Sequence, residues 1–449
     1  MGCMGNTTNA RGIVSLAGIK GLLNQTYKSE FVRNVAVVAS GTAGAQAIVI
    51  AFSPIITRLY GPEAFGILGI FMAIVAVVTP IAALSYPIAI VLPKEDSDAR
   101  GIARLSAYIA LGVAALTALL LLTAGDKIVN LLQVQEVSSY IWLLPLVILF
   151  SAWLQINQQW VIRRKHFKLM ARATVLHAFL VNGAKAGIGL FKPLAAVLIV
   201  LYALGQALHA ALLSLGAKRA DGCAPQAHKK DHQTSLWDLA RRHYDFPCYR
   251  APQRIVYAVS ERLPVLMFAA FLGPAYAGFY VLCIRFLKLP GELIGKSVYD
   301  VFYPKITEAA HAGENLANLI LKATLGLAAT GVFPFALIVF LGPWLFGFVF
   351  GQEWVVAGEY ARWLSVWVFI QFITRAGSAS VPVLGLQKVH LIYEIIRVLL
   401  LVIALIVGLY IYENDVYAVM LFSFAGATKN IVLFITIYWV SKSFKFQEG

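Results

Sequence analysis

Charged residues recur at helical spacing along one apolar stretch of the chain, residues 278–303. They are Arg285, Lys288, Glu292, Lys296 and Asp300. Spacings of three and four residues place all of them on one side of a helix. At about 1.5 Å rise per residue, the stretch is long enough to cross a bilayer. An ionised side chain at the bilayer centre costs at least about 2.5–3.5 kcal/mol. This side of the helix must therefore face protein partners or a water-filled cavity.

Other apolar segments also carry charges, and basic residues outnumber acidic ones. A cavity lined by arginine and lysine, away from bulk water, attracts polyanions. Guanidinium groups bind phosphate oxygens in pairs, and lysine adds a point charge. The pattern therefore predicts a cationic cavity for a phosphate-bearing cargo. The side chains expected to line it are Arg254, Arg285, Lys288, Lys296, Lys185, Arg375, Arg58 and Lys429.

Ion pairing between helices is an alternative role for several of these charges. Glu394 with Arg397, and Glu261 with Arg262, are as well explained by structural pairs as by substrate contacts. Lys296 lies near one end of its predicted span, where a long side chain can reach the aqueous interface.

Two carboxylates, Glu261 and Glu292, lie near mid-depth of their predicted spans. They either couple transport to a cation or proton, or simply neutralise a neighbouring arginine. The sequence leaves both roles open.

The sequence lacks the motifs of the common catalytic classes. It contains no Walker A loop, no HExxH and no nucleophile elbow. Its four cysteines follow no CxxC spacing, so we expect unpaired thiols and no metal site. We therefore expect no catalytic residues and no cofactor, only coupling to H+ or Na+.

Composition places the chain in a membrane. Of 449 residues, 60% are hydrophobic and 13% charged, whereas soluble proteins carry about 25% charged residues. The mean hydropathy is +0.76. We predict an all-α polytopic protein with about 12 transmembrane helices. Their approximate bounds are 34–57, 65–92, 102–124, 138–162, 170–191, 193–216, 246–272, 277–303, 316–341, 360–384, 389–411 and 416–441.

Basic residues alternate between successive loops. They concentrate in both tails and in the loops 93–101, 163–169, 217–245, 304–315 and 385–388, and are sparse in the loops between these. By the positive-inside rule, both termini are cytoplasmic, in agreement with an even number of spans. Topology thus explains much of the net charge of +15, and we expect membrane lipids rather than nucleic acid as partners.

The two halves of the chain repeat. Gly61-Pro62 followed by Gly66 recurs as Gly273-Pro274 followed by Gly278. Six spans per half give both halves the same orientation, with a pseudo-twofold axis along the membrane normal and substrate between the halves. The predicted parts are an N-terminal segment 1–33, a six-helix bundle 34–216, a basic linker 217–245, a second bundle 246–441 and a tail 442–449.

A family resemblance rests on two stretches: the run FVRN at 31–34 and the block ITRLYGPEAFG at 56–66. They resemble bacterial polysaccharide-biosynthesis membrane proteins, the O-antigen or Wzx-type flippases of the multidrug/oligosaccharidyl-lipid/polysaccharide (MOP) superfamily. The resemblance implies two six-helix bundles around a cationic cavity. It implies movement of undecaprenyl-pyrophosphate-linked glycan, such as a lipopolysaccharide repeat unit, to the outer leaflet of the bacterial cytoplasmic membrane by ion-coupled alternating access. It also implies polysaccharide polymerase and assembly proteins as partners.

Two other functions are alternatives to a flippase. A cation-coupled multidrug exporter of the same superfamily favours acidic or aromatic cavity walls, which the cationic stripe contradicts. A membrane-embedded glycan polymerase or ligase usually needs a sizeable catalytic loop outside the cell, and the predicted outside loops are short.

Overall fold

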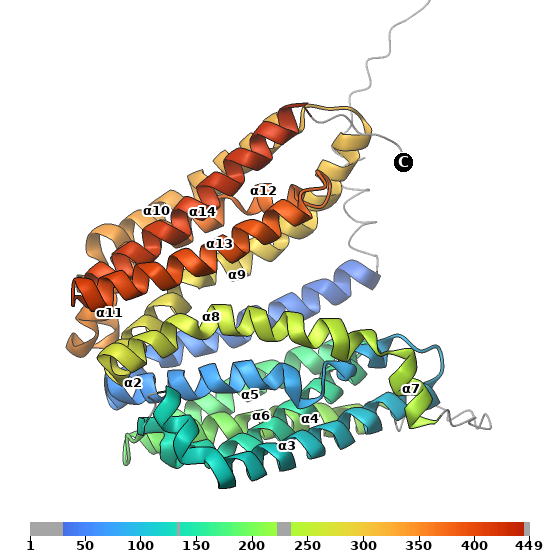
Figure 1. The fold of residues 1–449 in the computed structure, drawn as a ribbon. Helices are drawn as coiled ribbons and strands as arrows, with labels where there is room; N and C mark the ends of the chain where they lie inside the picture. Colours follow the sequence, from blue (N-terminus) through green and yellow to red (C-terminus); the bar gives the residue numbers. More distant parts are fainter. Residues whose placement is uncertain (1–29, 133–134, 222–234, 444–449) are drawn as a thin grey trace, which may run out of the picture.

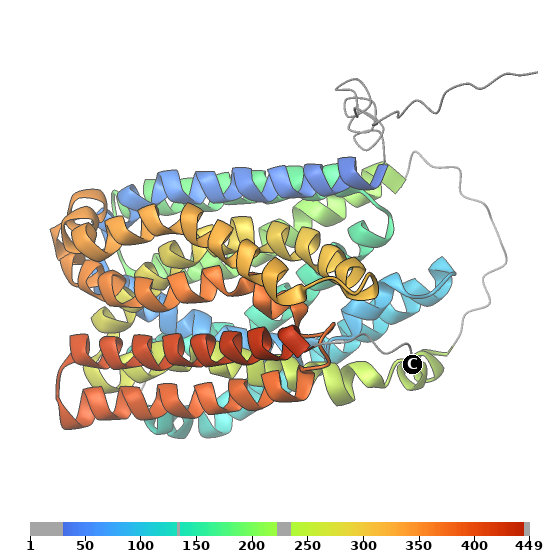
Figure 2. The same cartoon turned by 90° about the horizontal axis from the view of Figure 1, so that it is seen from above.

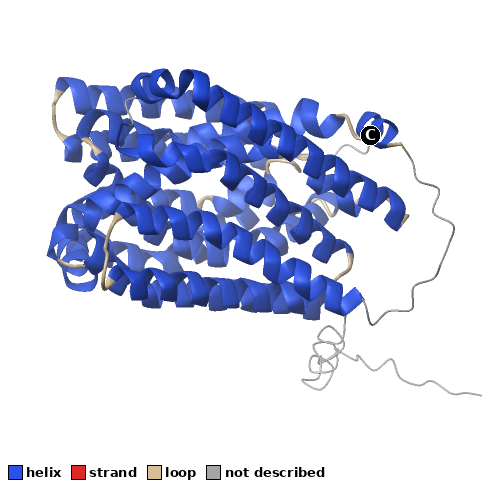
Figure 3. Ribbon diagram, turned by 90° about the horizontal axis from the view of Figure 1, so that it is seen from below, coloured by secondary structure: helices blue, strands red, loops and turns tan. Residues whose placement is uncertain are grey.

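A computed structural model describes residues 30–132, 135–221 and 235–443, and every regular element among them is helical (Figure 3). The predicted all-α polytopic fold is confirmed. Eight helices of the described part are long and apolar enough to span a membrane, which fits a multi-pass protein. One of these, α2, covers the first predicted span and most of the second, as two helical segments that meet at Gly61. The second predicted span, 65–92, also includes η1, which follows α2.

The helices form two bundles that follow each other in the chain (Figure 1). The first bundle contains α2 (Glu30–Ala82), α3 (Asp96–Leu132), α4 (Leu144–Arg163), α5 (Phe167–Gly189) and α6 (Ala195–Asp221), with η1 (Tyr86–Val91) and η2 (Gln135–Leu143). The short helix α7 (Leu236–Arg242) leads to the second bundle. That bundle contains η3 (Phe246–Arg250), α8 (Ala251–Leu272), α9 (Pro274–His311), α10 (Leu316–Phe350), η4 (Gln352–Trp354), α11 (Val355–Ile373), α12 (Arg375–Ser380), α13 (Gln387–Ile406), η5 (Val407–Ile411) and α14 (Asp415–Ser443).

Apolar side chains cover the outside of both bundles as well as their cores. Leu122 on α3 is 71% exposed and Phe340 on α10 is 75% exposed. Helices that are apolar on all sides belong in lipid. The long helices run roughly parallel, and α2 begins at the same end of the molecule where α14 finishes (Figure 2).

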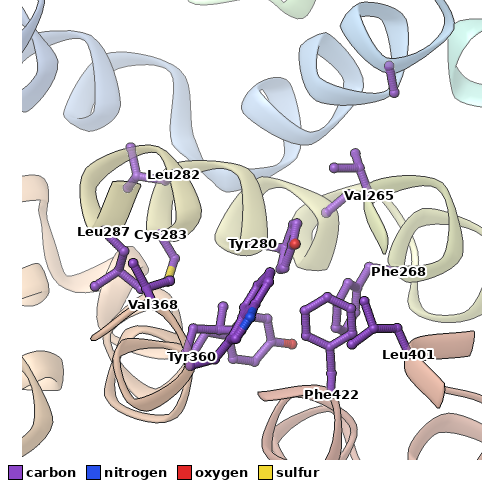
Figure 4. Packing of buried hydrophobic residues seen from close by; sticks show 14 of the residues in the cluster. Val265, Phe268, Tyr280, Leu282, Cys283, Leu287, Tyr360, Val368, Leu401 and Phe422 are labelled. Carbon is purple, nitrogen blue, oxygen red and sulfur yellow. The ribbon is translucent and has the colours of Figure 1, made fainter. Parts of the chain in front are cut away.

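The second bundle has an aromatic core where α8, α9, α11 and α14 meet (Figure 4). The ring of Phe268 lies 5.4 Å from that of Tyr280 and 5.8 Å from that of Tyr360. Phe422 meets Tyr280 edge to face at 6.1 Å. The Tyr360 hydroxyl donates to Asp415 Oδ2 at 2.8 Å, which satisfies the one polar atom that this ring buries. Large aromatic surfaces thus fix four helices of this bundle together.

The described part of the predicted linker packs on the first bundle. Leu239 of α7 is buried, and Arg242 forms a 3.2 Å salt bridge with Asp98 of α3. The Tyr86 hydroxyl donates to the Ala240 carbonyl at 3.1 Å. The chain therefore enters η3 and α8 from a fixed position.

The repeated Gly-Pro blocks are turns between successive helical segments. Gly61 has φ 67° and Gly273 has φ 97°, a backbone region that glycine adopts without steric cost. Pro62 and Pro274 follow directly and start the next helical segment, where proline is favoured because its fixed φ suits a helix and it lacks an N–H. The same local chemistry thus turns the chain at equivalent points in the two halves.

The helices that follow these turns touch backbone to backbone. A Cβ atom at Gly66 would lie 1.7 Å from the carbonyl oxygen of Pro274, and one at Gly278 would lie 2.1 Å from that of Pro62. Only glycine permits this approach. The pseudo-symmetric turns therefore pack on each other where the two bundles meet, and we call this region the Gly61 junction.

Hydrogen bonds reinforce the Gly61 junction from both bundles. Trp354 Nε1 donates to the Thr57 carbonyl at 3.2 Å, and Arg58 Nη2 donates to the Phe348 carbonyl at 2.6 Å. Away from this junction the second bundle inclines from the first (Figure 1). The bundles are thus joined tightly at one end and spread towards the other.

Gly66→Ala should destabilise the protein by about 1–3 kcal/mol, because the added methyl group overpacks the junction. Gly112→Ala on α3 is the matched control, since nothing lies within 4 Å of its Cβ position. Alanine there should be neutral or stabilising by up to about 1 kcal/mol. Thermal unfolding of the purified protein in detergent measures both. Equal melting temperatures for the two variants would contradict the close approach.

Candidate functional site

A polar cavity of about 520 Å³ lies between the two bundles, away from the Gly61 junction. Helix α4 and η1 of the first bundle line it together with η3 and α8 of the second. Its polar side chains are Gln155, Gln158, Gln159, Arg250, Gln253, Arg254 and Tyr257. We call it the inter-bundle cleft.

Helix α4 turns a row of glutamines towards this cleft. Gln155, Gln158 and Gln159 follow helical spacing on one face, and Trp153 and Trp160 lie on the opposite face. The Nε2 atom of Gln155 is buried and has no hydrogen-bond partner among the described residues. A buried amide of this kind gains from a polar ligand that accepts its hydrogen bond.

Arginines of η3 and α8 bring positive charge to the same cleft. Arg250 donates to Gln253 Oε1 at 3.2 Å. Arg254 is half-buried and forms no salt bridge with any described residue. The cleft therefore combines neutral amides, which both donate and accept hydrogen bonds, with guanidinium groups suited to phosphate oxygens.

Further charged residues form what we call the central group: Lys185 on α5, Arg285 on α9, Glu292 on α9 and Arg375 on α12. Lys185 and Arg285 come from different bundles and are close enough to repel each other. Arg375 packs on α9, with its Nη2 atom 3.4 Å from the Cβ position of Gly291. Glu292 interacts electrostatically with both arginines, but no salt bridge within 4.0 Å joins these four described side chains.

The central group lies between the cleft and the Gly61 junction. Arg375 interacts electrostatically with Tyr257, which lines the cleft. At the other side, the Lys185 carbonyl accepts a 2.8 Å hydrogen bond from Tyr60, the residue next to Gly61. Cationic residues are therefore found both beside the cleft and near the Gly61 junction.

A second set of charges is mutually neutralised within the second bundle. Lys288 Nζ lies 2.8 Å from Glu261 Oε2, and Arg397 Nε lies 2.8 Å from Glu394 Oε2. Lys429 also pairs with Glu394. These pairs tie α8 to α9 and α13 to α14, and we call them the ion-pair network.

Arg397 links the two parts of the network. Its Nη2 atom donates to Ser260 Oγ of α8 at 3.3 Å, and its charge also acts on Glu261. Both Arg397 and Lys429 are buried, at 9% and 7% exposure. Removing Glu394 would leave both buried cations without their salt-bridge partner, which is costly.

The predicted site residues fall into separate places. Arg254 lines the cleft, while Lys185, Arg285 and Arg375 belong to the central group together with Glu292. Lys288, Lys429 and Glu261 belong to the ion-pair network. Arg58 lies at the Gly61 junction and holds the end of α10. Lys296 is on α9, but its side chain lies outside the described ones. Their roles towards substrate or coupling ion stay predictions.

The structure shows which of the predicted ion pairs form. Glu394 and Arg397 do pair. Glu261 forms its salt bridge with Lys288, while Arg262 is only within electrostatic range. Sequence reasoning did not identify the glutamine row as part of the site. The sequence did contain a signal for this row, because three glutamines lie inside one predicted span in a stretch of five residues.

Comparison with solved structures places this fold among membrane transporters. The chain superposes with a TM-score of 0.66 on lipid II flippase MurJ in an inward closed conformation, at 13% identity over 90% of this chain and 87% of the other. It superposes with 0.63 on an inward-facing multidrug resistance MATE family transporter of the MOP superfamily, at 15% identity over 88% and 94%. For an outward-facing MATE family transporter the score is 0.55, at 15% identity over 91% and 96%. The chain therefore has the fold that MurJ and these MATE family transporters share.

The family assignment is narrower than the fold. A family model described as polysaccharide biosynthesis protein matches residues 55–359. The chain belongs to this polysaccharide biosynthesis protein family. A comparison with curated protein sequences finds no match.

The repulsion between Lys185 and Arg285 can be measured by a double-mutant cycle. We expect Lys185→Met and Arg285→Met to show repulsive coupling of about 0.5–3 kcal/mol, because either change alone relieves the same repulsion. The control cycle combines Lys185→Met with Lys322→Met, an exposed position on α10, and should be additive within about 0.5 kcal/mol. Melting temperatures in detergent report both cycles. Additive effects in the first cycle would show that the two cations are not neighbours.

Proposed function

We propose that this protein is a flippase for undecaprenyl-pyrophosphate-linked oligosaccharide, moving an O-antigen or other surface polysaccharide repeat unit from the inner to the outer leaflet. One observation carries the proposal. Cations of both bundles, Lys185, Arg254, Arg285 and Arg375, gather between the bundles and form no salt bridge with described residues. Positive charge without a salt-bridge partner inside the membrane costs stability, and an anionic cargo would offset that cost.

The chemistry of the site suits both polar parts of such a cargo. Pyrophosphate supplies adjacent anionic oxygens that guanidinium groups bind bidentately. Sugar hydroxyls both donate and accept hydrogen bonds, as the amides of Gln155, Gln158 and Gln159 do. The polyprenyl tail would stay in the lipid, while the head group passes between the bundles.

Alternating access would follow from opening and closing the two ends in turn. By the predicted topology, the Gly61 junction is on the outer side of the membrane, so this structure is closed outward. The higher TM-score with the inward-facing than with the outward-facing MATE transporter supports this assignment. We place the protein in the bacterial cytoplasmic membrane with both termini in the cytoplasm.

An H+ or Na+ gradient would drive the cycle, since the sequence encodes no Walker A loop. Glu292 is the carboxylate better placed for coupling, because it lies near Arg285 and Arg375 without a salt bridge. Glu261 is held by Lys288. Polysaccharide polymerase and assembly proteins would receive the exported glycan.

A multidrug exporter is less compatible with these charges. Organic cations would be repelled by a site in which Lys185, Arg285 and Arg375 outnumber Glu292. The electrostatics therefore favour an anionic cargo.

Arg285→Gln and Arg375→Gln should each lower glycan export about ten- to hundredfold. Each removes a charge-assisted hydrogen bond to phosphate, worth about 1.5–3 kcal/mol. Complementation of a flippase-deficient strain, read as surface polysaccharide and as lipid-linked oligosaccharide retained inside, measures the loss. Lys322→Gln removes the same charge from an exposed position of α10 and should export normally. Immunoblots confirm equal protein amounts. Full export by both central-group variants would refute the assignment.

A further inference from the structure

A second pocket lies on the first bundle, between α3, α4 and α6. Its volume is about 310 Å³, and Ala103, Ile156, Trp160 and Ala217 give it a mainly apolar lining. It shares no residue with the inter-bundle cleft. Helix α4 separates the two, because its glutamine face lines the cleft and its Trp160 face lines this pocket. The pocket therefore belongs to the outer surface of the bundle rather than to the transport path.

The position of the pocket along the helices places it at a membrane surface. It lies close to the start of α3 at Asp96, the end of α4 at Arg163 and the end of α6 at Asp221. Further along the same helices, Tyr108 is 61% exposed and Leu215 is 55% exposed, as expected of a lipid-facing belt. Tryptophan is enriched at the boundary between head groups and hydrocarbon, and Trp160 lies at this boundary.

Positive charge surrounds this apolar pocket. Arg104 of α3 and Lys218 of α6 are exposed and line it from two helices, and Arg100 adds a third cation. None of the described residues lining it is acidic. A basic rim on an apolar pocket between membrane helices matches a phospholipid that carries net negative charge on its head group.

We propose that this pocket binds an anionic phospholipid of the surrounding leaflet. The phosphate would lie between Arg104 and Lys218, and an acyl chain would pack along Ile156 and Ala217. Trp160 would contact the glycerol region between them. This proposal does not depend on the transported cargo, since the pocket and the cleft are lined by different residues.

Native mass spectrometry of the purified protein with added phosphatidylglycerol tests the site. The double variant R104Q/K218Q should bind this lipid about tenfold more weakly, because two attractive charges are lost. Binding of zwitterionic phosphatidylcholine should change by less than twofold. The matched control K168Q/R219Q removes the same charge from exposed basic residues near the same helix ends that do not line the pocket. It should bind phosphatidylglycerol like the unmodified protein.

A second variant keeps every charge and fills the pocket. Ala103→Phe should weaken phosphatidylglycerol binding at least fivefold, because the ring occupies the space of the acyl chain. If R104Q/K218Q fails to fold, the Ala103→Phe variant still tests whether the lipid binds in this pocket. Unchanged phosphatidylglycerol binding in the folded pocket variants, or an equal loss in K168Q/R219Q, would overturn the proposal.

Discussion

The cost of placing positive charge without a salt-bridge partner between membrane helices governs this structure. Lys185 and Arg285 come from different bundles, repel each other, and belong to helices of spanning length. Lipid would not solvate them, so both must point into protein or water between the bundles. Their repulsion works against bringing the bundles together. The compensating attraction comes from the Gly61 junction, where Gly66 and Gly278 allow backbone contact and many dispersion interactions.

The second bundle separates its charges into two classes. Lys288, Arg397 and Lys429 have carboxylate partners and hold helices in place. Arg285 and Arg375 form no salt bridge with any described residue, and the carboxylate that acts on both of them is the more distant Glu292. Paired charges fix a rigid body, whereas unpaired ones keep their capacity to bind a ligand. This separation explains how a bundle with so many intramembrane charges can be stable and still able to bind a ligand.

Local sequence chemistry predicted the all-helical fold and the repeated turns. Apolar stretches of spanning length and a Gly-Pro pair each depend on residues close in the chain, so they can be read directly. The ion-pair and hydrogen-bond partners of charged residues could not be predicted in this way. Glu261 pairs with Lys288, 27 residues away, rather than with adjacent Arg262, because neighbouring residues on a helix point about 100° apart. Arg58 reaches the end of α10, which no local pattern signals.

The contact between Tyr60 and Lys185 has a mechanical consequence. Tyr60 precedes the turn at Gly61, its hydroxyl holds the backbone of α5 at Lys185, and its ring lies over Gly189. A rotation of α2 about its glycine turn would therefore also move the backbone of α5 at Lys185, the half-buried lysine whose charge acts on Arg285. In such a rotation the turn at Gly61 would be the pivot, and α5 would move with it. An anion beside Lys185 would weaken its repulsion with Arg285, so ligand binding at this site would be coupled to the angle between the bundles.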